Sequence, residues 1–294
     1  MLILLFYQQL AKNWQLILLW FFSHIAFAQT EKVIHVEIGV YVGAYNKYPQ
    51  FMHQDVCLSP PDFKYQQTDR TLGEIIILCE AISATGYQLK PHFHSLPNNF
   101  RGLLLLEKGL LDALSSSLWP FEFKNSDVNV TEAAVLKGEF EKGLYVSNKN
   151  TKLLNQSLNK SDIKKLTGIT ISKWRHDVEL MKTLTPKVVE IEHHLATFKL
   201  LDTQRGDFVL SEFSNQETFQ ICQQTICITA LQGLKVVIED TRHFVASKST
   251  QNGKQYFQLL SSGMAKLKEK GRIRQLYEQM GFINPKVKDW KRLN

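Results

Sequence analysis

The feature that most constrains the fold is an alternation of strand-like and helix-like segments, which occurs twice along the chain. Strands are predicted where apolar and polar side chains alternate, and helices where apolar side chains recur at helical spacing. The first strand-helix-strand-helix-strand series covers residues 33–40, 71–85, 87–93, 98–108 and 111–118. The second series covers residues 166–172, 177–184, 188–191, 195–204 and 207–210. Helical crossovers favour parallel sheets covered on both faces, so the sequence predicts an α/β protein with two similar units.

Four stretches lie outside these two series. Residues 41–69 form a long irregular segment, a length at which loops are usually functional or disordered. Residues 133–148 separate the two series, and residues 236–247 predict a further strand. Residues 255–280 predict one or two closing helices, with a glycine able to end the first of them.

The N-terminus has the pattern of an export signal. Residues 1–28 contain Lys12 and no acidic residue, and an apolar run over 16–28 ends in Ala-Phe-Ala. This pattern predicts a Sec-type signal peptide that is cleaved after Ala28. An uncleaved anchor is the alternative, although the run is short for a span of ~20 residues. No later segment is long and apolar enough to be a span, so we expect the mature protein to be soluble.

The predicted export bears on the state of the four cysteines. An even number in an oxidising compartment favours disulfides. Cys222 and Cys227 bracket a short polar turn and are the predicted pair, with free thiols as the alternative. Whether Cys57 and Cys79 are bonded stays open, because Cys79 lies in an apolar helical run and also fits a core position. A zinc site is not expected here, since no histidine lies near Cys222 or Cys227.

The composition excludes several classes of protein. Apolar residues make up 44% and charged residues 21%, proportions of a globular chain rather than of a disordered or fibrous one. The net charge is +7, and the densest basic stretches are residues 266–274 and 286–292. No nucleic-acid-binding motif accompanies them, so no nucleic-acid partner is expected. Mild basicity agrees with an anionic ligand.

Three motifs carry a resemblance to a known family. Residues 109–114, Gly-Leu-Leu-Asp-Ala-Leu, have an echo in residues 205–210, Arg-Gly-Asp-Phe-Val-Leu. Residues 262–277 match a closing helix-Gly-helix pattern around Gly271. In this order and spacing, the motifs resemble those of periplasmic solute-binding proteins of family 3, the amino-acid-binding type with the type II periplasmic-binding fold. The resemblance covers nearly all of residues 33–285.

The resemblance implies a two-lobed α/β fold in which each lobe is a mostly parallel sheet flanked by helices. Lobe 1 would comprise residues 33–135 plus 241–294, and lobe 2 residues 136–240. Two hinge strands would join the lobes near residues 135–137 and 239–241. Binding of a ligand would close the lobes about these hinges.

The resemblance also implies a function. The protein would be a periplasmic monomer that captures a small solute, an amino acid or a related polar or anionic molecule, for an inner-membrane ABC permease. The alternative is a ligand-responsive sensor, or partner of a membrane signalling protein, with the same fold. A dehydratase-like enzyme is disfavoured, because the chain has no recognisable catalytic motif. Six histidines are candidates by residue type only: His92, His94, His176, His193, His194 and His243. No cofactor or metal is expected.

Three charged residues map onto the family's ligand site. Lys124 stands where amino-acid-binding members carry an arginine for the ligand carboxylate, and a lysine offers only a point charge. Arg175, at the start of a helix in the second lobe, is the residue that would supply the missing guanidinium. Glu212 is expected to hold a ligand amino group. For Lys124 and Glu212, an ordinary surface role is the alternative.

Aromatic and hydroxyl residues complete the expected site. Tyr45 and Tyr48, together with Tyr41, would lie at the cleft mouth after the first strand. Ser116, Ser117 and Trp119 follow the third strand, at the sheet edge where ligands of α/β proteins bind. Trp174 would stack on a ligand or seal the cleft, with a buried structural role as the alternative.

Overall fold

The structure is a computed structural model that describes residues 32–59, 69–193 and 195–294. The predicted signal peptide and its cleavage after Ala28 lie outside these residues. Within the described ranges, no helix combines the length and the apolar character that a membrane span requires.

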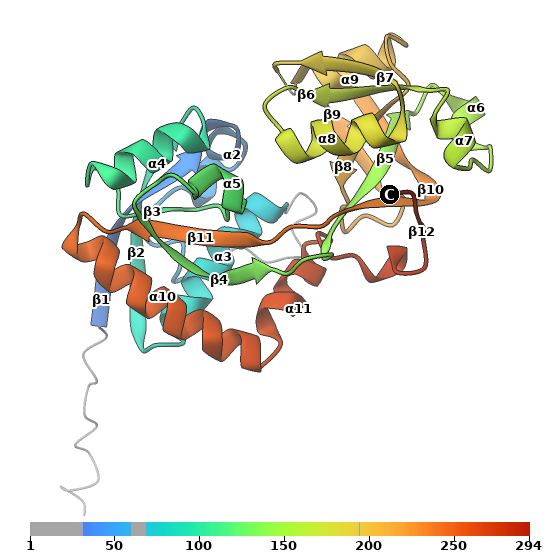
Figure 1. The fold of residues 1–294 in the computed structure, drawn as a ribbon. Helices are drawn as coiled ribbons and strands as arrows, with labels where there is room; N and C mark the ends of the chain where they lie inside the picture. Colours follow the sequence, from blue (N-terminus) through green and yellow to red (C-terminus); the bar gives the residue numbers. More distant parts are fainter. Residues whose placement is uncertain (1–31, 60–68, 194) are drawn as a thin grey trace, which may run out of the picture. The chain divides into compact units, whose positions relative to one another are not determined.

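The first sheet contains five strands in the order β2-β1-β3-β11-β4 (Figure 1). Strand β1 pairs in parallel with β3, whereas β11 is antiparallel to both β3 and β4. The strand bounds are β1 Lys32–Tyr41, β2 Tyr87–Leu96, β3 Ala113–Leu114, β4 Val128–Val135 and β11 Arg242–Ser247. The helices between these strands and after β11 are α2 Val42–Lys47, α3 Arg70–Ser83, α4 Asn99–Glu107, α5 Pro120–Phe123, α10 Gln251–Glu269 and α11 Arg272–Gln279, with a 3-10 turn η1 at Pro49–Phe51.

The second sheet has the order β12-β10-β5-β8-β6-β7, and β9 pairs with β10. Its strands are β5 Phe140–Ser147, β6 Thr167–Ile171, β7 Lys187–Ile191, β8 Phe208–Glu212, β9 Gln220–Gln223, β10 Ile226–Ile238 and β12 Lys291–Arg292. Strand β6 is parallel to β7 and β8, whereas β5 is antiparallel to β8 and β10. Its helical segments are α6 Thr151–Leu154, α7 Lys160–Ile163, α8 Arg175–Leu184, α9 Leu195–Asp202 and the 3-10 turn η2 Pro285–Val287.

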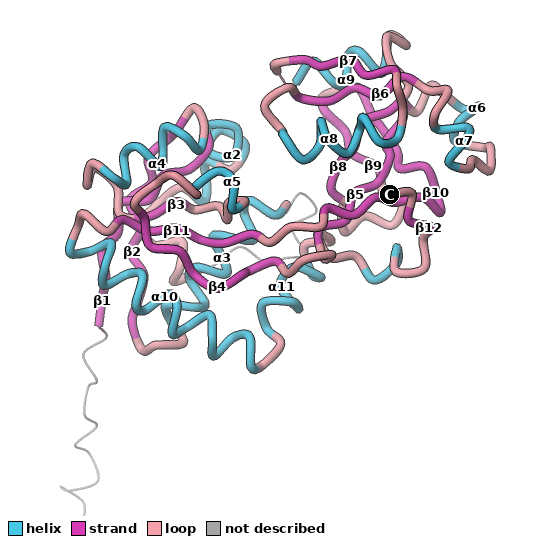
Figure 2. The backbone as a smooth tube through the Cα atoms, in the orientation of Figure 1, coloured by secondary structure: helices cyan, strands magenta, loops and turns pink. Residues whose placement is uncertain are grey.

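The chain passes between the two sheets through two short crossings. Residues 136–139 lead from β4 to β5, and residues 239–241 lead back from β10 to β11. Figure 2 shows both crossings as loops between strands. Near its end the chain joins the second sheet again, because β12 pairs in parallel with β10. The expected division of the chain assigned residues 241–294 wholly to lobe 1, and β12 departs from it.

The predicted α/β class with two helix-flanked sheets is confirmed, but both sheets are mixed rather than mostly parallel. The physical reason lies in the crossings, since each strand that returns after a crossing pairs antiparallel to a neighbour in its sheet. Residues 236–247, predicted as one strand, are divided between β10 and β11. Residues 111–118 hold only the two-residue strand β3, and part of the irregular segment after β1 is helical.

The central helix of the first sheet explains how the core is built. Asp69 caps α3 by accepting hydrogen bonds from the backbone N–H groups of Thr71 and Leu72. Residues 72–79 of α3 are all buried, so this helix is enclosed rather than amphipathic. Helix α10 packs on it at Gly263, where an added Cβ would meet the Ala81 carbonyl oxygen at 1.8 Å. The glycine therefore sets how closely α3 and α10 approach.

Both cysteine pairs are bonded. The predicted Cys222–Cys227 disulfide is confirmed, and it links β9 to β10 at a directly paired position. The pairing that the sequence left open also forms, since Cys57 is bonded to the buried Cys79 of α3. This second bond ties the segment after η1 to the enclosed helix.

Candidate functional site

A network of charged side chains connects the two sheets. We call it the crossing cluster and define it by Arg70, Glu74, Ser117, Glu212 and Arg242. At its centre, the fully buried Glu74 carboxylate accepts hydrogen bonds from the Ser117 N–H (3.1 Å), the Ser117 hydroxyl (2.5 Å) and Tyr277 Oη (3.2 Å). A buried carboxylate needs such donors, because leaving water without them is costly.

Arg70 joins the two sheets by ion pairs. As the first residue of α3, it pairs through Nη1 with Glu74 Oε2 at 3.0 Å. Its Nε pairs with Oε1 of Glu212, at the end of β8 in the second sheet, at 3.1 Å. Burial alone would lower the pKa of Arg70, but the charges of Glu212 and Glu74 outweigh it and raise that pKa. Arg70 is therefore a permanent cation with two carboxylate partners.

Arg242 is the second guanidinium of the cluster and lies immediately after the second crossing. It is 5% exposed, and its Nε donates to Ser117 Oγ at 3.0 Å while Nη2 donates to the Ser117 carbonyl oxygen. In the described part of the chain, no carboxylate forms an ion pair with it. Burial and the like charge of Arg70 lower the pKa of Arg242, against the opposing influence of Glu74, Glu122 and Glu212. Arg242 is thus a buried cation without an ion-pair partner of its own.

Aromatic rings surround Arg242 and reach the second sheet. Its guanidinium carbon lies 4.5 Å from the centroid of the Trp119 ring. Trp119 in turn contacts the His176 ring of α8 at 4.7 Å between centroids. His176 Nε2 also lies 2.9 Å from Asp240 Oδ2, in the second crossing. Side chains of both sheets and of a crossing therefore meet at Trp119 and His176.

The start of α8 supplies more charge to this region. Arg175, its first residue, holds its guanidinium 5.3 Å from the Phe121 ring. The buried pair Lys142 and Asp177 is joined at 2.5 Å, and Lys142 Nζ lies 5.4 Å from the ring of Trp174. Trp174 is 45% exposed, so the alternative of a buried structural role for it is wrong.

The structure brings four of the sequence-predicted residues into connected contacts. Ser117 and Glu212 belong to the crossing cluster, Trp119 contacts it, and Arg175 is linked through Phe121 and His176. Ser117 is nevertheless fully buried, so its hydroxyl serves Glu74 and Arg242 rather than an open surface. Ser116 is half-buried beside it.

Three predicted residues lie elsewhere. Lys124 is exposed directly after α5. Tyr45 lines a hollow of about 540 Å³ that Glu37 and His92 also line. Tyr48, the residue between α2 and η1, is 1% exposed, so a position at an open cleft mouth is wrong for it.

Sequence reasoning missed Arg70, Glu74 and Arg242. One local signal was available, since Glu74 is an acidic residue inside an apolar helical run and Arg70 precedes it by four residues. An acid on an otherwise buried helix face indicates a buried charge with partners. Arg242 offered no comparable signal, because its partner Ser117 is 125 residues away in the sequence.

Comparison with known proteins supports the fold. The sequence matches no protein-family model and no curated protein sequence. Among solved structures, the probable amino-acid ABC transporter extracellular-binding protein YtmK from Bacillus subtilis is similar, with a TM-score of 0.54 and 14% identity over 85% of this chain and 99% of that chain. YckB from Bacillus subtilis is similar with a TM-score of 0.50 and 15% identity over 88% and 94% of the two chains. The chain therefore has the two-lobed fold of the type II periplasmic-binding proteins.

Proposed function

We propose that this protein is an exported solute-binding protein that captures a small anionic or zwitterionic molecule, such as an amino acid, between its two sheets. The fold supports this proposal, because YtmK, which shares it, is described as a probable amino-acid ABC transporter extracellular-binding protein. The single observation that carries it is Arg242, a buried guanidinium without a carboxylate partner among the described residues, beside a second guanidinium where the sheets meet.

The proposed chemistry is the compensation of a buried charge. A ligand carboxylate that reaches Arg242 supplies the missing counter-charge, and a planar guanidinium can bind two carboxylate oxygens at once. In the ligand-free protein, burial and the like charge of Arg70 lower the pKa of Arg242. The same anion would relieve the repulsion from Arg70. In this proposal Arg242, rather than Lys124, takes the place of the carboxylate-binding arginine.

The remaining parts of the ligand have candidate partners nearby. Glu212 and Asp240 are carboxylates that can accept hydrogen bonds from a ligand ammonium group, although each already has a partner, Arg70 and His176. The ring of Trp119 offers an apolar face. A ligand with both charges would exchange these internal contacts for its own, which couples binding to a rearrangement between the sheets.

We further propose the setting of this activity. One lobe would comprise residues 33–135 plus 241–294 and the other residues 136–240, except that β12 pairs with the sheet of the second lobe. The lobes would close about the two crossings. The signal at residues 1–28 would direct the protein to the periplasm. Its partner would be an inner-membrane ABC permease, with a membrane signalling protein as the alternative partner.

A thermal-shift screen tests the proposal. The purified protein is heated with amino acids, polyamines, organic acids and short peptides, and a ligand at 100 times its Kd is expected to add roughly 2.7 kcal/mol, a shift of several degrees. Arg242→Met should abolish the shift from carboxylate ligands. Lys124→Ala is the matched control, because it removes an exposed cation that the proposal does not use.

Two outcomes would contradict this assignment. If no compound shifts the melting temperature, the solute-binding function is wrong. If Lys124→Ala removes the shift and Arg242→Met leaves it unchanged, the function stands but the anion site is the one that the family resemblance indicates.

A further inference from the structure

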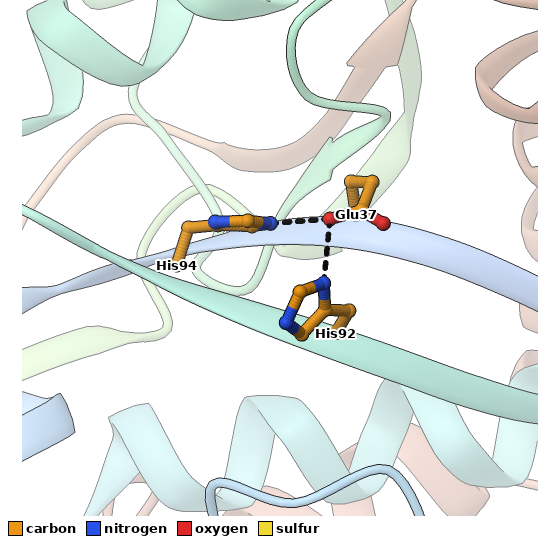
Figure 3. A group of neighbouring side chains, drawn as sticks. All are labelled: Glu37, His92 and His94. Carbon is orange, nitrogen blue, oxygen red and sulfur yellow. Dashed lines mark hydrogen bonds and ion pairs between the residues drawn. The ribbon is translucent and has the colours of Figure 1, made fainter.

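A cluster of three side chains, Glu37, His92 and His94, lies on the first sheet and shares no residue with the crossing cluster. Figure 3 shows His92 and His94, which belong to β2, pointing toward Glu37 on the neighbouring strand β1. His92 Nδ1 lies 3.0 Å from Glu37 Oε2, and His94 Nε2 contacts the same carboxylate oxygen. One nitrogen of each histidine and one Glu37 oxygen all lie within 4.8 Å of one another.

The sheet itself creates this arrangement. Side chains two residues apart on a strand point to the same face, so His92 and His94 stand side by side. The backbone of Glu37 is fixed from the other side, since its N–H donates to Asp112 Oδ2 at 2.9 Å and its carbonyl accepts from the Asp112 N–H at 2.8 Å. The three groups are therefore held together by strand pairing rather than by a flexible loop.

The cluster is open to solvent. The side chains of His92 and Glu37 are 73% and 47% exposed, and that of His94 is 40% exposed. Glu37 and His92 line the hollow of about 540 Å³ described above, which His35 and His53 also line. A dissolved ion can reach the three groups, and the hollow leaves room for water on the side that they do not occupy.

We propose that Glu37, His92 and His94 form a binding site for a divalent transition-metal ion, with Zn²⁺ as the first candidate. Two imidazoles and one carboxylate are a donor set of zinc sites that keep a fourth position for water. Imidazole ligands favour Zn²⁺, Cu²⁺ and Ni²⁺ over Mg²⁺ and Ca²⁺, which prefer oxygen ligands. The ion would take the place of the direct contacts between the two imidazoles and the Glu37 carboxylate.

The site has a structural consequence for the sheet. Among the described residues, strand β2 is at the edge of the first sheet and pairs with β1 alone. A bound ion would cross-link the edge strand to its neighbour. The metal-loaded protein is therefore expected to melt at a higher temperature than the metal-free protein, because the ion binds the folded arrangement.

Direct metal binding tests this inference. Tag-free protein is purified after export, stripped with EDTA and titrated with Zn²⁺ in competition with a chromophoric chelator. One equivalent is expected to bind to the wild type. Removing a residue that only hydrogen-bonds to a metal ligand typically lowers metal affinity 10–100-fold. Removing a ligand itself, in His92→Ala, His94→Ala or Glu37→Gln, should therefore weaken binding at least about tenfold.

The controls keep the result interpretable. His193→Ala removes an exposed histidine outside the cluster and should bind Zn²⁺ like the wild type. Far-UV circular dichroism and melting in EDTA should be unchanged for all variants, which separates loss of a ligand from loss of the fold. If the double variant H92A/H94A keeps one Zn²⁺ equivalent at wild-type affinity, or if the wild type binds none, the proposed site is wrong.

Discussion

The crossing cluster and the cluster of Glu37, His92 and His94, here called the Glu37 cluster, are both arranged around a glutamate but differ in their surroundings. In the crossing cluster, Glu74 is fully buried, and two hydrogen bonds from Ser117, one from Tyr277 and the ion pair with Arg70 satisfy it. In the Glu37 cluster, the acid is 47% exposed and has two histidines as side-chain partners. Burial makes each charge of the first cluster dependent on its partners, whereas water can replace any partner in the second.

The two clusters also differ in the charge of the ligand that each suits. Buried guanidiniums cannot lose their charge, so the crossing cluster suits an anion that compensates Arg242. Imidazole nitrogens and a carboxylate oxygen are ligands of metal ions, so the Glu37 cluster suits a cation. The four predictions below sharpen this comparison, and they begin with the largest expected effect.

Glu74→Ala should be the most damaging change. It leaves Arg70, Ser117 and Tyr277 without their common acceptor inside the protein, and breaking a buried pair in this way costs about 3–5 kcal/mol. Urea unfolding measures the loss. Glu80→Ala is the control in the same helix, because its pair with Arg272 is partly exposed to water and should cost less to break than the buried pair. Equal losses for the two variants would contradict the role of burial.

Glu212→Gln should have an intermediate effect. Arg70 loses one of its two charged partners but keeps Glu74 and a neutral acceptor at position 212. We expect a loss of about 1–2 kcal/mol, within the range for hydrogen bonds to charged groups. The same unfolding experiment measures it. A loss as large as that of Glu74→Ala would show that Glu212, rather than Glu74, is the main partner of Arg70.

Arg242→Met should change the stability of the ligand-free protein by less than about 1 kcal/mol. The variant loses the hydrogen bonds to Ser117, but it also removes a buried cation beside Arg70, and apolar replacements of buried charges are often tolerated. Ligand binding, by contrast, should be lost. A strongly destabilised Arg242→Met protein would indicate that Arg242 is a structural residue and not a site held ready for an anion.

The double variant H92A/H94A should have the smallest effect on stability in the absence of metal. Substitutions of exposed side chains away from the core usually change the free energy of unfolding by no more than about 0.5 kcal/mol. Melting in EDTA should therefore match the wild type, and only added Zn²⁺ should reveal a difference between the two proteins. A large loss in EDTA would mean that the contacts of His92 and His94 with Glu37 already hold β2 in place.

Much of the fold could be predicted because its signals are local. The helix periodicity after residue 70 predicts α3 to within two residues, and its capping residue Asp69 is adjacent in the sequence. Gly271, with φ of 66°, separates α10 from α11 as its place in the closing motif indicated. The Cys222–Cys227 pair was predictable because the two residues flank a single turn.

The site was predicted less completely. Mapping along the family motifs indicated Trp119, Arg175 and Glu212, which lie in or next to the crossing cluster. The same mapping indicated Lys124, which is exposed after α5, because counting positions from a motif follows the sequence and not the packing. Tyr48 was misplaced for the same reason, since whether a loop residue is buried depends on the segments that cover it.

The sequence by itself indicated the two strand-helix series, the closing helices and the close disulfide, because each depends on residues that are near one another in the chain. Only the tertiary structure decided which charges meet. Arg70 and Glu212 are 142 residues apart, and Glu37 and His92 are 55 apart. Their proximity depends on strand order within the sheets and on the two crossings, which no local pattern encodes. Both proposed sites therefore arise from pairings that the fold creates.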